Sequence, residues 1–385
     1  MIPYGKQDIN ENDIAAVEEV LRSPFLTQGP CLAEFEQSIC DATNAKHAIA
    51  TNSATAALHI ACLALGVGEG DIVWTSPVSF VASANCAIYC GAKIDFVDID
   101  PSSFNMSVSC LEEKLKRAKL INALPKVVIP VHLSGQSCDM EAIWKLSREY
   151  NFSIIEDASH AIGAYYKNEP VGQCRYSDIA VFSFHPVKII TTAEGGCAVT
   201  QDQHLAQKLS LLRSHGITRD EKLMTHEKDG QWYYQQVMLG FNYRMTELQA
   251  ALGRSQMTRL RDFVEVRNKF AVQYDALLSK LPLDTPVRSS DTYSSFHLYI
   301  IQLQIDQISK THETVFSELR DAGIGVNLHY IPIHIQPYYQ NLGFRPGDFP
   351  NAEAYYSKSL SIPLHSGMCD EDVHRVVNSL KEVLT

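Results

Sequence analysis

The sequence lacks the patterns that mark membrane and secreted proteins. No apolar run approaches the roughly 20 residues that a membrane-spanning helix needs, and the opening residues, MIPYGKQDIN, show no signal-peptide pattern. The ten cysteines are scattered, and no two of them form a CxxC motif. Because several cysteines stand inside apolar segments, we expect reduced core thiols, with neither disulfides nor a zinc or other metal site. These features together predict a cytoplasmic protein with no membrane partner.

An excess of positive charge is lacking as well, and we find no internal repeat or low-complexity tract. Asp and Glu number 44 against 33 Lys and Arg, and the formal net charge of -11 argues against nucleic acid as a partner. A phosphorylated ligand stays possible, because the backbone N–H groups of a helix N-terminus bind phosphate without net positive charge. The length of 385 residues exceeds what one hydrophobic core usually accommodates, so we expect two domains.

Strand-like apolar runs alternate with helix-like segments through the first half of the chain. Strands are predicted at residues 47–51, 71–77, 93–100, 126–132, 152–159, 179–184 and 196–200, and helices at residues 56–66, 79–91, 110–118 and 140–150. Such alternation predicts an α/β fold with a mostly parallel sheet that is sandwiched by helices. In such sheets, ligands bind beyond the carboxyl ends of the strands.

The segments on either side of this region are mainly helical. Helices are predicted at residues 8–22 and 32–43, and a helical run over residues 246–281 is long enough to bridge two lobes. A smaller α+β part follows, with an alternating strand at 296–305, a helix at 312–323, a strand at 324–334 and a closing helix at 371–384. We therefore predict a large domain over residues 1–245, whose first residues can pack on the small domain, and a small C-terminal domain over residues 246–385. Residues 219–236 are polar and aromatic without a period, and we expect a loop that covers the site.

Lys188 is the one lysine in the stretch SFHPVKIITTAEGG, among apolar and small residues. It follows the apolar run Ile179–Phe182, which predicts a buried strand. Desolvation disfavours the ammonium form, and a lysine with a lowered pKa can attack a carbonyl carbon to form a Schiff base. Ser183 would stand at the strand end, where its hydroxyl can reach an anion. A surface lysine in a loop is the commoner interpretation of such a residue taken alone, so its partners elsewhere decide between the two.

The segment Asn52-Ser53-Ala54-Thr55 joins a predicted strand to a predicted helix. Free N–H groups of a first helical turn, hydroxyls and the helix dipole favour an anion at such a place. The same residue types also make an ordinary N-cap, and the pattern leaves both interpretations open.

Asp157 ends the apolar run over residues 152–155. A buried carboxylate is costly unless it meets a cation, and a protonated pyridine nitrogen is one such cation. The alternative is an aspartate that caps the next turn. Nearby His160 and Ser159 supply donors for a phenolic oxygen, and Phe80 offers an aromatic face to a flat ring unless it belongs to the core. An anion site, an aromatic face, a carboxylate and a lysine are the four groups that pyridoxal 5'-phosphate needs.

Six motifs carry a resemblance to a known family across nearly the whole chain. They occur in order as NSATAAL, PVSFVAS, EDASHAIGA, SFHPVK with TTAEGG, GFNYRMTELQAALG and HYIPIHIQPYY. With these motifs the sequence resembles the nucleotide-sugar aminotransferases of the DegT/DnrJ/EryC/StrS group. The resemblance implies the fold type I of pyridoxal-phosphate-dependent aminotransferases, with pyridoxal 5'-phosphate as the cofactor.

The resemblance also implies roles for individual residues. Lys188 would form the Schiff base with the cofactor, Asp157 would pair with its pyridine nitrogen, and His160 would lie near its phenolic oxygen. The other cofactor contacts that it implies are Ser53, Ala54, Thr55, Phe80, Ser183 and, from the neighbouring subunit of a homodimer with shared active sites, Asn242. The substrate contacts that it implies are Tyr4, Pro24, Phe25, Leu26, Thr27, His329 and Tyr330. Relatives that dehydrate their substrate carry histidine at the lysine position, so Lys188 favours transamination, with L-glutamate as the expected amino donor.

Some of the sequence motifs resemble one branch of this family. NSAT, PVSFVAS, SFHPVK followed by IITTAEGG, and RSHGI are similar to the UDP-linked branch that makes the 4-amino precursor of pseudaminic acid. We therefore expect a UDP-ketosugar substrate that is aminated at C4. Pro186-Val187 and the Tyr233-Tyr234 region leave another UDP- or dTDP-ketosugar open. A lyase or dehydratase and a non-catalytic regulatory binder of the same fold are the rival classes.

Overall fold

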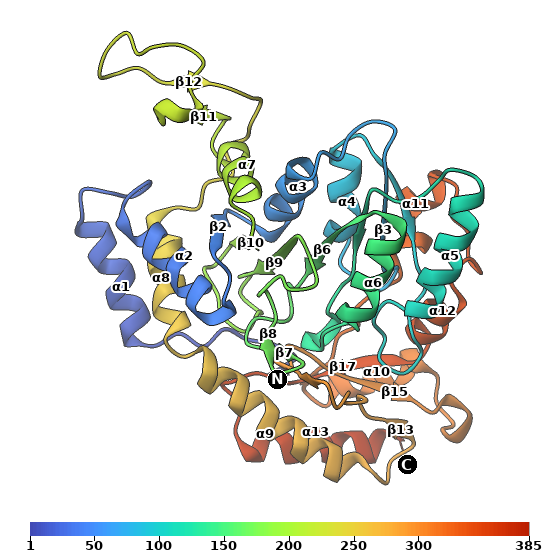
Figure 1. Cartoon of the computed structure of the whole chain (residues 1–385). Coiled ribbons are helices and arrows are strands. Elements are labelled where there is room, and N and C mark those ends of the chain that lie inside the picture. Colours follow the sequence, from blue (N-terminus) through green and yellow to red (C-terminus); the bar gives the residue numbers. More distant parts are fainter. Residues whose placement is uncertain (385) are drawn as a thin grey trace.

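The computed structural model describes residues 1–384 and centres on a seven-stranded sheet (Figure 1). The strand order is β2-β10-β9-β6-β5-β3-β4. The strands are β2 (His47–Thr51), β3 (Ile72–Thr75), β4 (Lys93–Phe96), β5 (Val127–Ile129), β6 (Ser153–Asp157), β9 (Ile179–Ser183) and β10 (Gly196–Thr200). Only β10 runs antiparallel to its neighbours in this sheet, so the predicted mostly parallel sheet is confirmed.

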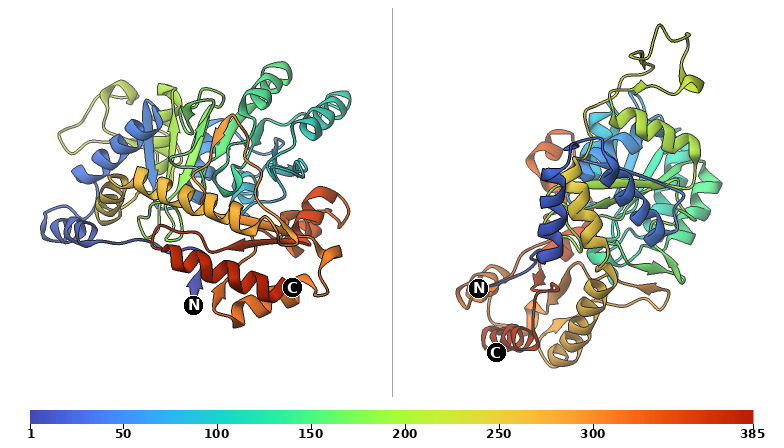
Figure 2. Two further views of the ribbon diagram at one scale, coloured as in Figure 1. Left: turned by 90° about the horizontal axis from the view of Figure 1, so that it is seen from below. Right: turned by 90° about the vertical axis from the view of Figure 1, so that its left-hand side faces the viewer.

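Helices cover both faces of the sheet, as the two views of Figure 2 show. On β9, Ile179 and Val181 belong to the buried cluster of one face, and Ala180 and Phe182 belong to that of the other. The first face packs against α3 (Ala54–Ala64), α4 (Ala82–Tyr89) and α7 (Gln203–Arg213); the second packs against α2 (Pro30–Thr43), α5 (Val108–Leu120), α6 (Met140–Tyr150) and α8 (Glu247–Met257). Because both faces are buried, the strands are continuous apolar runs in the sequence.

A further buried cluster forms from the C-terminal third of the chain. Its three-stranded antiparallel sheet has the order β13-β15-β17 and packs against three helices. These elements are β13 (Leu283–Asp284), β15 (Tyr299–Leu303), β17 (Ser359–Ile362), α9 (Leu260–Leu278), α10 (His312–Asp321) and α13 (Asp370–Leu384). Strand β1 (Ile2–Pro3) pairs with β16 (Ile324–Gly325), so the first residues of the chain join this part. The domain boundary at residue 245 stays a prediction.

The helical run predicted over residues 246–281 is wrong as one helix, because the structure has two. Helix α8 ends at Met257 and α9 begins at Leu260. At the break, Arg259 has φ -110° and ψ 5°, and its guanidinium forms ion pairs with Asp8 (2.8 Å) and Asp13 (2.6 Å). These contacts tie the break to the N-terminal segment and to α1 (Glu11–Arg22), which a periodicity pattern does not register.

The strand predicted over residues 324–334 is also wrong beyond β16. After Gly325 the chain is a loop that ends in a 3-10 turn at Ile333–Ile335. Pro332 has no N–H to donate to a ladder, and the N–H of Ile333 bonds the carbonyl oxygen of Pro77 instead (2.8 Å). Every residue of β15 is buried, so the alternation of apolar and polar residues predicted there does not correspond to a solvent-exposed face.

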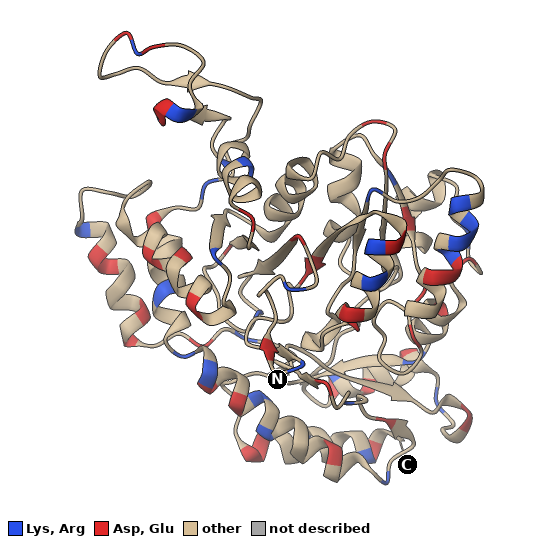
Figure 3. Ribbon diagram, viewed as in Figure 1, with Lys and Arg blue, Asp and Glu red and all other residues tan. Residues whose placement is uncertain are grey.

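The outer elements carry most of the charge. Figure 3 shows basic and acidic residues interspersed along α5 and α9, on the outside of the molecule. None of the helices within residues 1–384 is both long and apolar enough to span a bilayer. The remaining elements are β7 (Tyr165–Tyr166), β8 (Glu169–Pro170), β11 (Ile217–Thr218), β12 (Gln235–Gln236), β14 (Thr292–Tyr293), α11 (Pro337–Asn341) and α12 (Pro350–Tyr356).

Candidate active site

A cavity of about 870 Å³ opens where the parallel strands of the main sheet end. Its walls come from the main sheet and from the C-terminal third of the chain. Residues after β3, β6 and β9 face residues 327–330 across it. The structure brings eleven of the predicted site residues to this cavity: Tyr4, Ser53, Ala54, Thr55, Phe80, Asp157, His160, Ser183, Lys188, His329 and Tyr330.

Lys188 points into this cavity from a turn that follows β9. Its backbone N–H bonds the carbonyl oxygen of His185 (2.9 Å), which closes the turn. Burial lowers the pKa of the Lys188 amine to about 8, and the negative charge of Asp157 opposes this shift. The neutral form of the amine, which a nucleophile requires, is therefore far more populated near neutral pH than in an ordinary lysine.

Asp157 is held at the end of β6 with only 4% of its surface exposed. One carboxylate oxygen accepts a hydrogen bond from the Ser83 hydroxyl (2.5 Å), and the other accepts one from the backbone N–H of Ser159 (3.2 Å). The carboxylate thus caps the following turn, which was one of the two interpretations, and it also lines the cavity. Ser83 was missed in the sequence, where it read as part of a helix. Its spacing of three residues from Phe80 is a weak signal.

The segment between β2 and α3 forms an N-cap that also faces the cavity. The Ser53 hydroxyl accepts a hydrogen bond from the N–H of Ala56 (3.1 Å). Within residues 1–384, the N–H groups of Ala54 and Thr55 have no hydrogen-bond partner, and both residues line the cavity. Gly196 packs so close to this turn that a Cβ atom there would lie 2.4 Å from the nitrogen of Ala54. The cap and the anion site are therefore compatible interpretations of the same turn.

Phe80 does not belong to the core, because 59% of its surface is exposed. Its ring lies 6.3 Å from the ring of Tyr330 across the cavity, at an angle of 54°. The ring is therefore available to a planar ligand, as the first interpretation of the sequence expected.

His160 makes contacts that the sequence did not predict. Its Nδ1 lies 3.2 Å from the backbone nitrogen of Ser134, and its Nε2 lies 3.1 Å from the hydroxyl oxygen of Tyr330. Burial and the positive charge of Lys188 keep the pKa of His160 well below 6.5, so the ring is neutral. The His160 ring also lies 4.4 Å from the ring of His297, another cavity residue that the sequence analysis missed. The position of His297 inside the apolar stretch SSFHLYI was its available signal.

Three predicted segments lie outside the cavity of this chain. Asn242 is exposed and pairs with Ser214 in an isolated bridge, and residues 24–27 form an exposed loop. Residues 219–236 stand clear of the rest of the molecule, at the top left of Figure 1, and none of them lines the cavity. The prediction that residues 219–236 cover the site is wrong for this chain's own cavity, because β11 and β12 pair with each other and direct the segment outwards.

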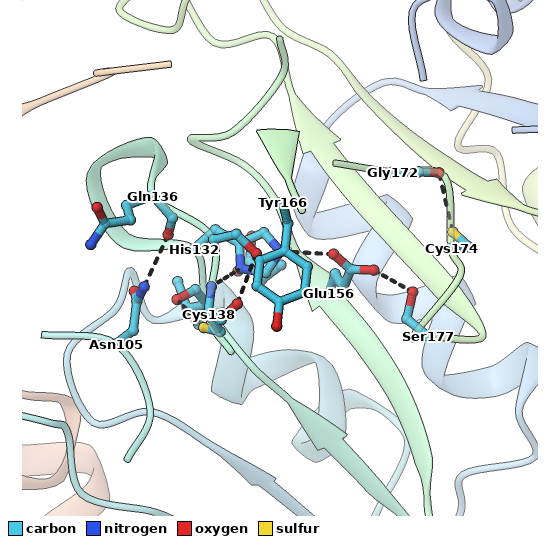
Figure 4. Close-up of polar contacts among 12 residues, drawn as sticks. Asn105, His132, Gln136, Cys138, Glu156, Tyr166, Gly172, Cys174 and Ser177 are labelled. Atoms are coloured by element: carbon cyan, nitrogen blue, oxygen red, sulfur yellow. Dashed lines mark hydrogen bonds and ion pairs between the residues drawn. The ribbon is translucent and has the colours of Figure 1, made fainter. Parts of the chain in front are cut away.

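A buried polar network surrounds Glu156, the residue before Asp157 in β6 (Figure 4). His132 Nε2 lies 2.8 Å from a carboxylate oxygen of Glu156, and the other oxygen of Glu156 accepts a hydrogen bond from Ser177. The N–H of Cys138 donates to His132 Nδ1 (3.2 Å). Because successive residues of a strand face opposite sides, Glu156 is satisfied inside the protein while Asp157 lines the cavity.

Comparisons with known proteins agree over the whole chain. A model of the DegT/DnrJ/EryC1/StrS aminotransferase family matches residues 7–381. The spore coat polysaccharide biosynthesis protein SpsC of Bacillus subtilis is 37% identical over 386 residues, covering 100% of this chain and 97% of SpsC. A UDP-4-amino-4,6-dideoxy-N-acetyl-beta-L-altrosamine transaminase of Campylobacter jejuni is 39% identical over 386 residues, covering 100% of this chain and 98% of the relative. The solved structure of Helicobacter pylori PseC, an aminotransferase of pseudoaminic acid biosynthesis, matches with a TM-score of 0.90 at 32% identity, covering 100% of this chain and 99% of PseC.

Proposed function

We propose a substrate and an amino donor for this chain on the premise that it belongs to the DegT/DnrJ/EryC1/StrS aminotransferase family. As a member, it is a pyridoxal-5'-phosphate-dependent nucleotide-sugar aminotransferase. We infer that it transfers the amino group of L-glutamate to C4 of UDP-2-acetamido-2,6-dideoxy-β-L-arabino-hex-4-ulose. The product would be UDP-4-amino-4,6-dideoxy-N-acetyl-β-L-altrosamine, which occurs in the name of the Campylobacter relative.

The observation that carries the proposal is the cavity-facing amine of Lys188, whose pKa is lowered to about 8, in one cavity with the buried carboxylate of Asp157. The other cavity residues fit the proposed cofactor. The free N–H groups of Ala54 and Thr55 would hold its phosphate, and the exposed ring of Phe80 would lie against its flat ring.

The mechanism follows from what these side chains can do. When bound, pyridoxal 5'-phosphate supplies a conjugated ring that accepts the electron pair left by removal of a proton from the donor. Asp157, held by Ser83 and by the N–H of Ser159, would keep the pyridine nitrogen protonated. The Lys188 amine would carry the proton, since a group with a pKa near 8 both accepts and releases one at neutral pH.

The charges in the cavity favour a dimer. Of the side chains that line it within residues 1–384, Lys188 is the one lysine or arginine, and it stands with the carboxylates of Asp157 and Glu194. A sugar nucleotide adds a pyrophosphate to the phosphate of the cofactor, so we infer that a second copy of the chain contributes to the site. Asn242 would reach the cofactor phosphate of the partner, and residues 24–27 would touch its sugar nucleotide.

The surface of the protruding segment supports this assembly. Trp232 and Leu239 are 74% and 78% exposed, on a segment most of which extends away from the rest of its own chain. Large exposed apolar residues of this kind are typical of interaction surfaces. Residues 217–239 are therefore the segment that we expect to contact the partner in a homodimer.

The cofactor assignment is tested by colour. The purified protein should absorb visible light, and L-glutamate should bleach this absorption. Lys188→Ala should lose the absorption and turnover together, and wild-type turnover by this variant would refute the role of Lys188. If the sites are shared, mixing Lys188→Ala with Asn242→Ala should recover activity in heterodimers with one intact site, whereas an active monomer would refute the dimer.

The substrate assignment is tested by kcat/KM on three ketosugars. These are the proposed L-arabino ketosugar, its D-xylo epimer and dTDP-4-keto-6-deoxyglucose. We expect the first to be preferred. A tenfold preference for either competitor, about 1.4 kcal/mol of transition-state discrimination, would overturn this substrate and leave the aminotransferase assignment intact.

A further inference from the structure

His160 joins two walls of the cavity that are far apart in sequence. Its backbone carbonyl oxygen accepts a hydrogen bond from the Ser295 hydroxyl (2.8 Å). Its ring contacts the backbone of Ser134 on one side and the hydroxyl of Tyr330 on the other. Ser134 follows β5 of the main sheet, whereas Tyr330 belongs to the loop after β16.

These contacts define the tautomer of His160. A backbone N–H can only donate, so Nδ1 must accept the hydrogen bond from Ser134 and carries no proton. In a neutral imidazole the proton then resides on Nε2. Nε2 is therefore the donor to the Tyr330 hydroxyl, 3.1 Å away, and the Tyr330 oxygen is the acceptor.

The loop that supplies the Ser134 N–H is itself held firmly. The Asn105 side chain accepts a hydrogen bond from the N–H of Leu133 (3.0 Å) and donates one to the carbonyl oxygen of Gln136 (2.9 Å), the second of which Figure 4 shows. Gly135 has φ +100°, and a Cβ atom there would lie 2.5 Å from the Ser295 hydroxyl. The donor to Nδ1 therefore keeps its place.

The hydroxyl hydrogen of Tyr330 is left without a protein partner. The contact with His160 is the one hydrogen bond of the Tyr330 hydroxyl within residues 1–384, and there the oxygen accepts. Tyr330 lines the cavity between Phe80 and His329. Burial raises the pKa of Tyr330 far above 10, so the hydroxyl keeps its proton near neutral pH.

We propose that His160 is a positioning residue that directs the hydroxyl hydrogen of Tyr330 into the cavity, where Tyr330 donates a hydrogen bond to an oxygen atom of the bound ligand. This inference rests on the proposed function, and the acceptor has two possible sources. It is either the phenolic oxygen of the cofactor or a carbonyl oxygen of the ketosugar. The direct contact between His160 and the phenolic oxygen that the sequence resemblance implied stays a prediction.

The first measurement is on Tyr330→Phe, which removes the hydroxyl and keeps the ring. The visible absorption of the protein loaded with pyridoxal 5'-phosphate is titrated with pH, and the reaction of the pyridoxamine form with the ketosugar is followed in a single turnover. A shift in the absorption titration identifies the cofactor as the acceptor, and a loss of about tenfold or more in the sugar step alone identifies the substrate. Either result supports the proposal, and no change beyond twofold in both overturns it.

The matched control is Tyr274→Phe. The Tyr274 hydroxyl is buried and donates to the carbonyl oxygen of Pro363 (2.9 Å), away from the cavity. This variant should lower the Tm of the apoprotein and leave both readouts unchanged. A purely structural role of Tyr330 would give the same pattern as this control. The absorption titration needs only the cofactor, so it stays informative if the proposed sugar is wrong.

The positioning role is tested by coupling. His160→Ala should reproduce the defect of Tyr330→Phe and should add less than twofold in a protein that already carries Tyr330→Phe. His160→Gln should recover part of the loss, because its amide can again donate to the Tyr330 oxygen. If the fold losses caused by His160→Ala and Tyr330→Phe multiply in the double variant, the two side chains act independently, and the proposal is overturned.

Discussion

The titration of Lys188 is the most direct test of the electrostatics of the cavity. Burial lowers the pKa of its amine from 10.5 to about 8. At pH 7, about one Lys188 amine in 11 is then neutral, against about one in 3,000 for an ordinary lysine. Since only the neutral amine reacts with an acylating reagent, the reactive fraction of Lys188 at pH 7 should be about 300 times that of a lysine with the ordinary pKa.

The assay is competitive acetylation of the apoprotein between pH 6 and pH 11, with mass spectrometry of the lysine peptides. The reactivity of Lys188 should level off near pH 8. Lys116 is the matched control, because it is exposed and Glu112 raises its pKa, so its reactivity should still be rising above pH 10.

Asp157→Asn tests whether the negative charge of Asp157 stabilises the ammonium form of Lys188. The Asp157 carboxylate raises the pKa of Lys188 against the effect of burial, so removal of its charge should move the midpoint below about 8. The asparagine oxygen can still accept the hydrogen bond from the N–H of Ser159, and its amide NH2 can donate to the Ser83 oxygen, so both neighbours keep a partner. A midpoint near 10.5 in the wild type, or an upward shift in Asp157→Asn, would refute the reasoning.

The same shift predicts a pH dependence of stability. The folded-state pKa of Lys188 lies below its unfolded value, so the unfolded chain binds more protons between pH 8 and about 10.5. The free energy of unfolding of the apoprotein should therefore rise with pH in this window, by at most about 3 kcal/mol, because cavity water screens part of the charge. Lys188→Met should remove this rise, as denaturant titrations at pH 8 and pH 10 would show.

Two further predictions concern residues around the cavity. Gly196→Ala should destabilise the apoprotein and weaken cofactor binding, because the added Cβ would lie 2.4 Å from the nitrogen of Ala54; cofactor affinity as tight as in the wild type would contradict the close packing. Glu156→Gln should cost about 1–3 kcal/mol of unfolding free energy, since it removes the charged acceptor of buried His132, whereas the exposed Glu113→Gln should change stability by less than about 1 kcal/mol. Equal changes in unfolding free energy for the two substitutions in urea denaturation would show that the buried pair of Glu156 and His132 stabilises the protein no more than an exposed pair does.

Much of the fold follows from local sequence. The strands predicted at residues 47–51 and 179–184 agree with β2 and, to within one residue, with β9, because a strand that is buried on both faces consists mostly of apolar residues. The break between α8 and α9 had no such signal. It depends on Arg259 meeting Asp8 and Asp13, residues about 250 positions earlier in the chain.

The same division runs through the site. Residue chemistry and strand ends were enough to nominate Lys188, Asp157 and the turn at residues 53–55. Each lies at or after the carboxyl end of a strand, and these strand ends meet at one edge of the sheet. The part of Ser83 in orienting Asp157 depends on how α4 packs against the end of β6, and no spacing in the sequence encodes that contact.

The sequence by itself determined which chemistry the chain can perform, because an isolated lysine, a carboxylate at a strand end and a helix N-terminus keep their character wherever they lie. The tertiary structure alone decided how these groups are tuned. The pKa of Lys188 depends on the walls that exclude water from it, and the proton of His160 is placed by a backbone N–H 26 residues away. Desolvation and hydrogen-bond direction depend on which residues are neighbours in space. These neighbours come together only when the main sheet and the C-terminal third of the chain pack around the cavity.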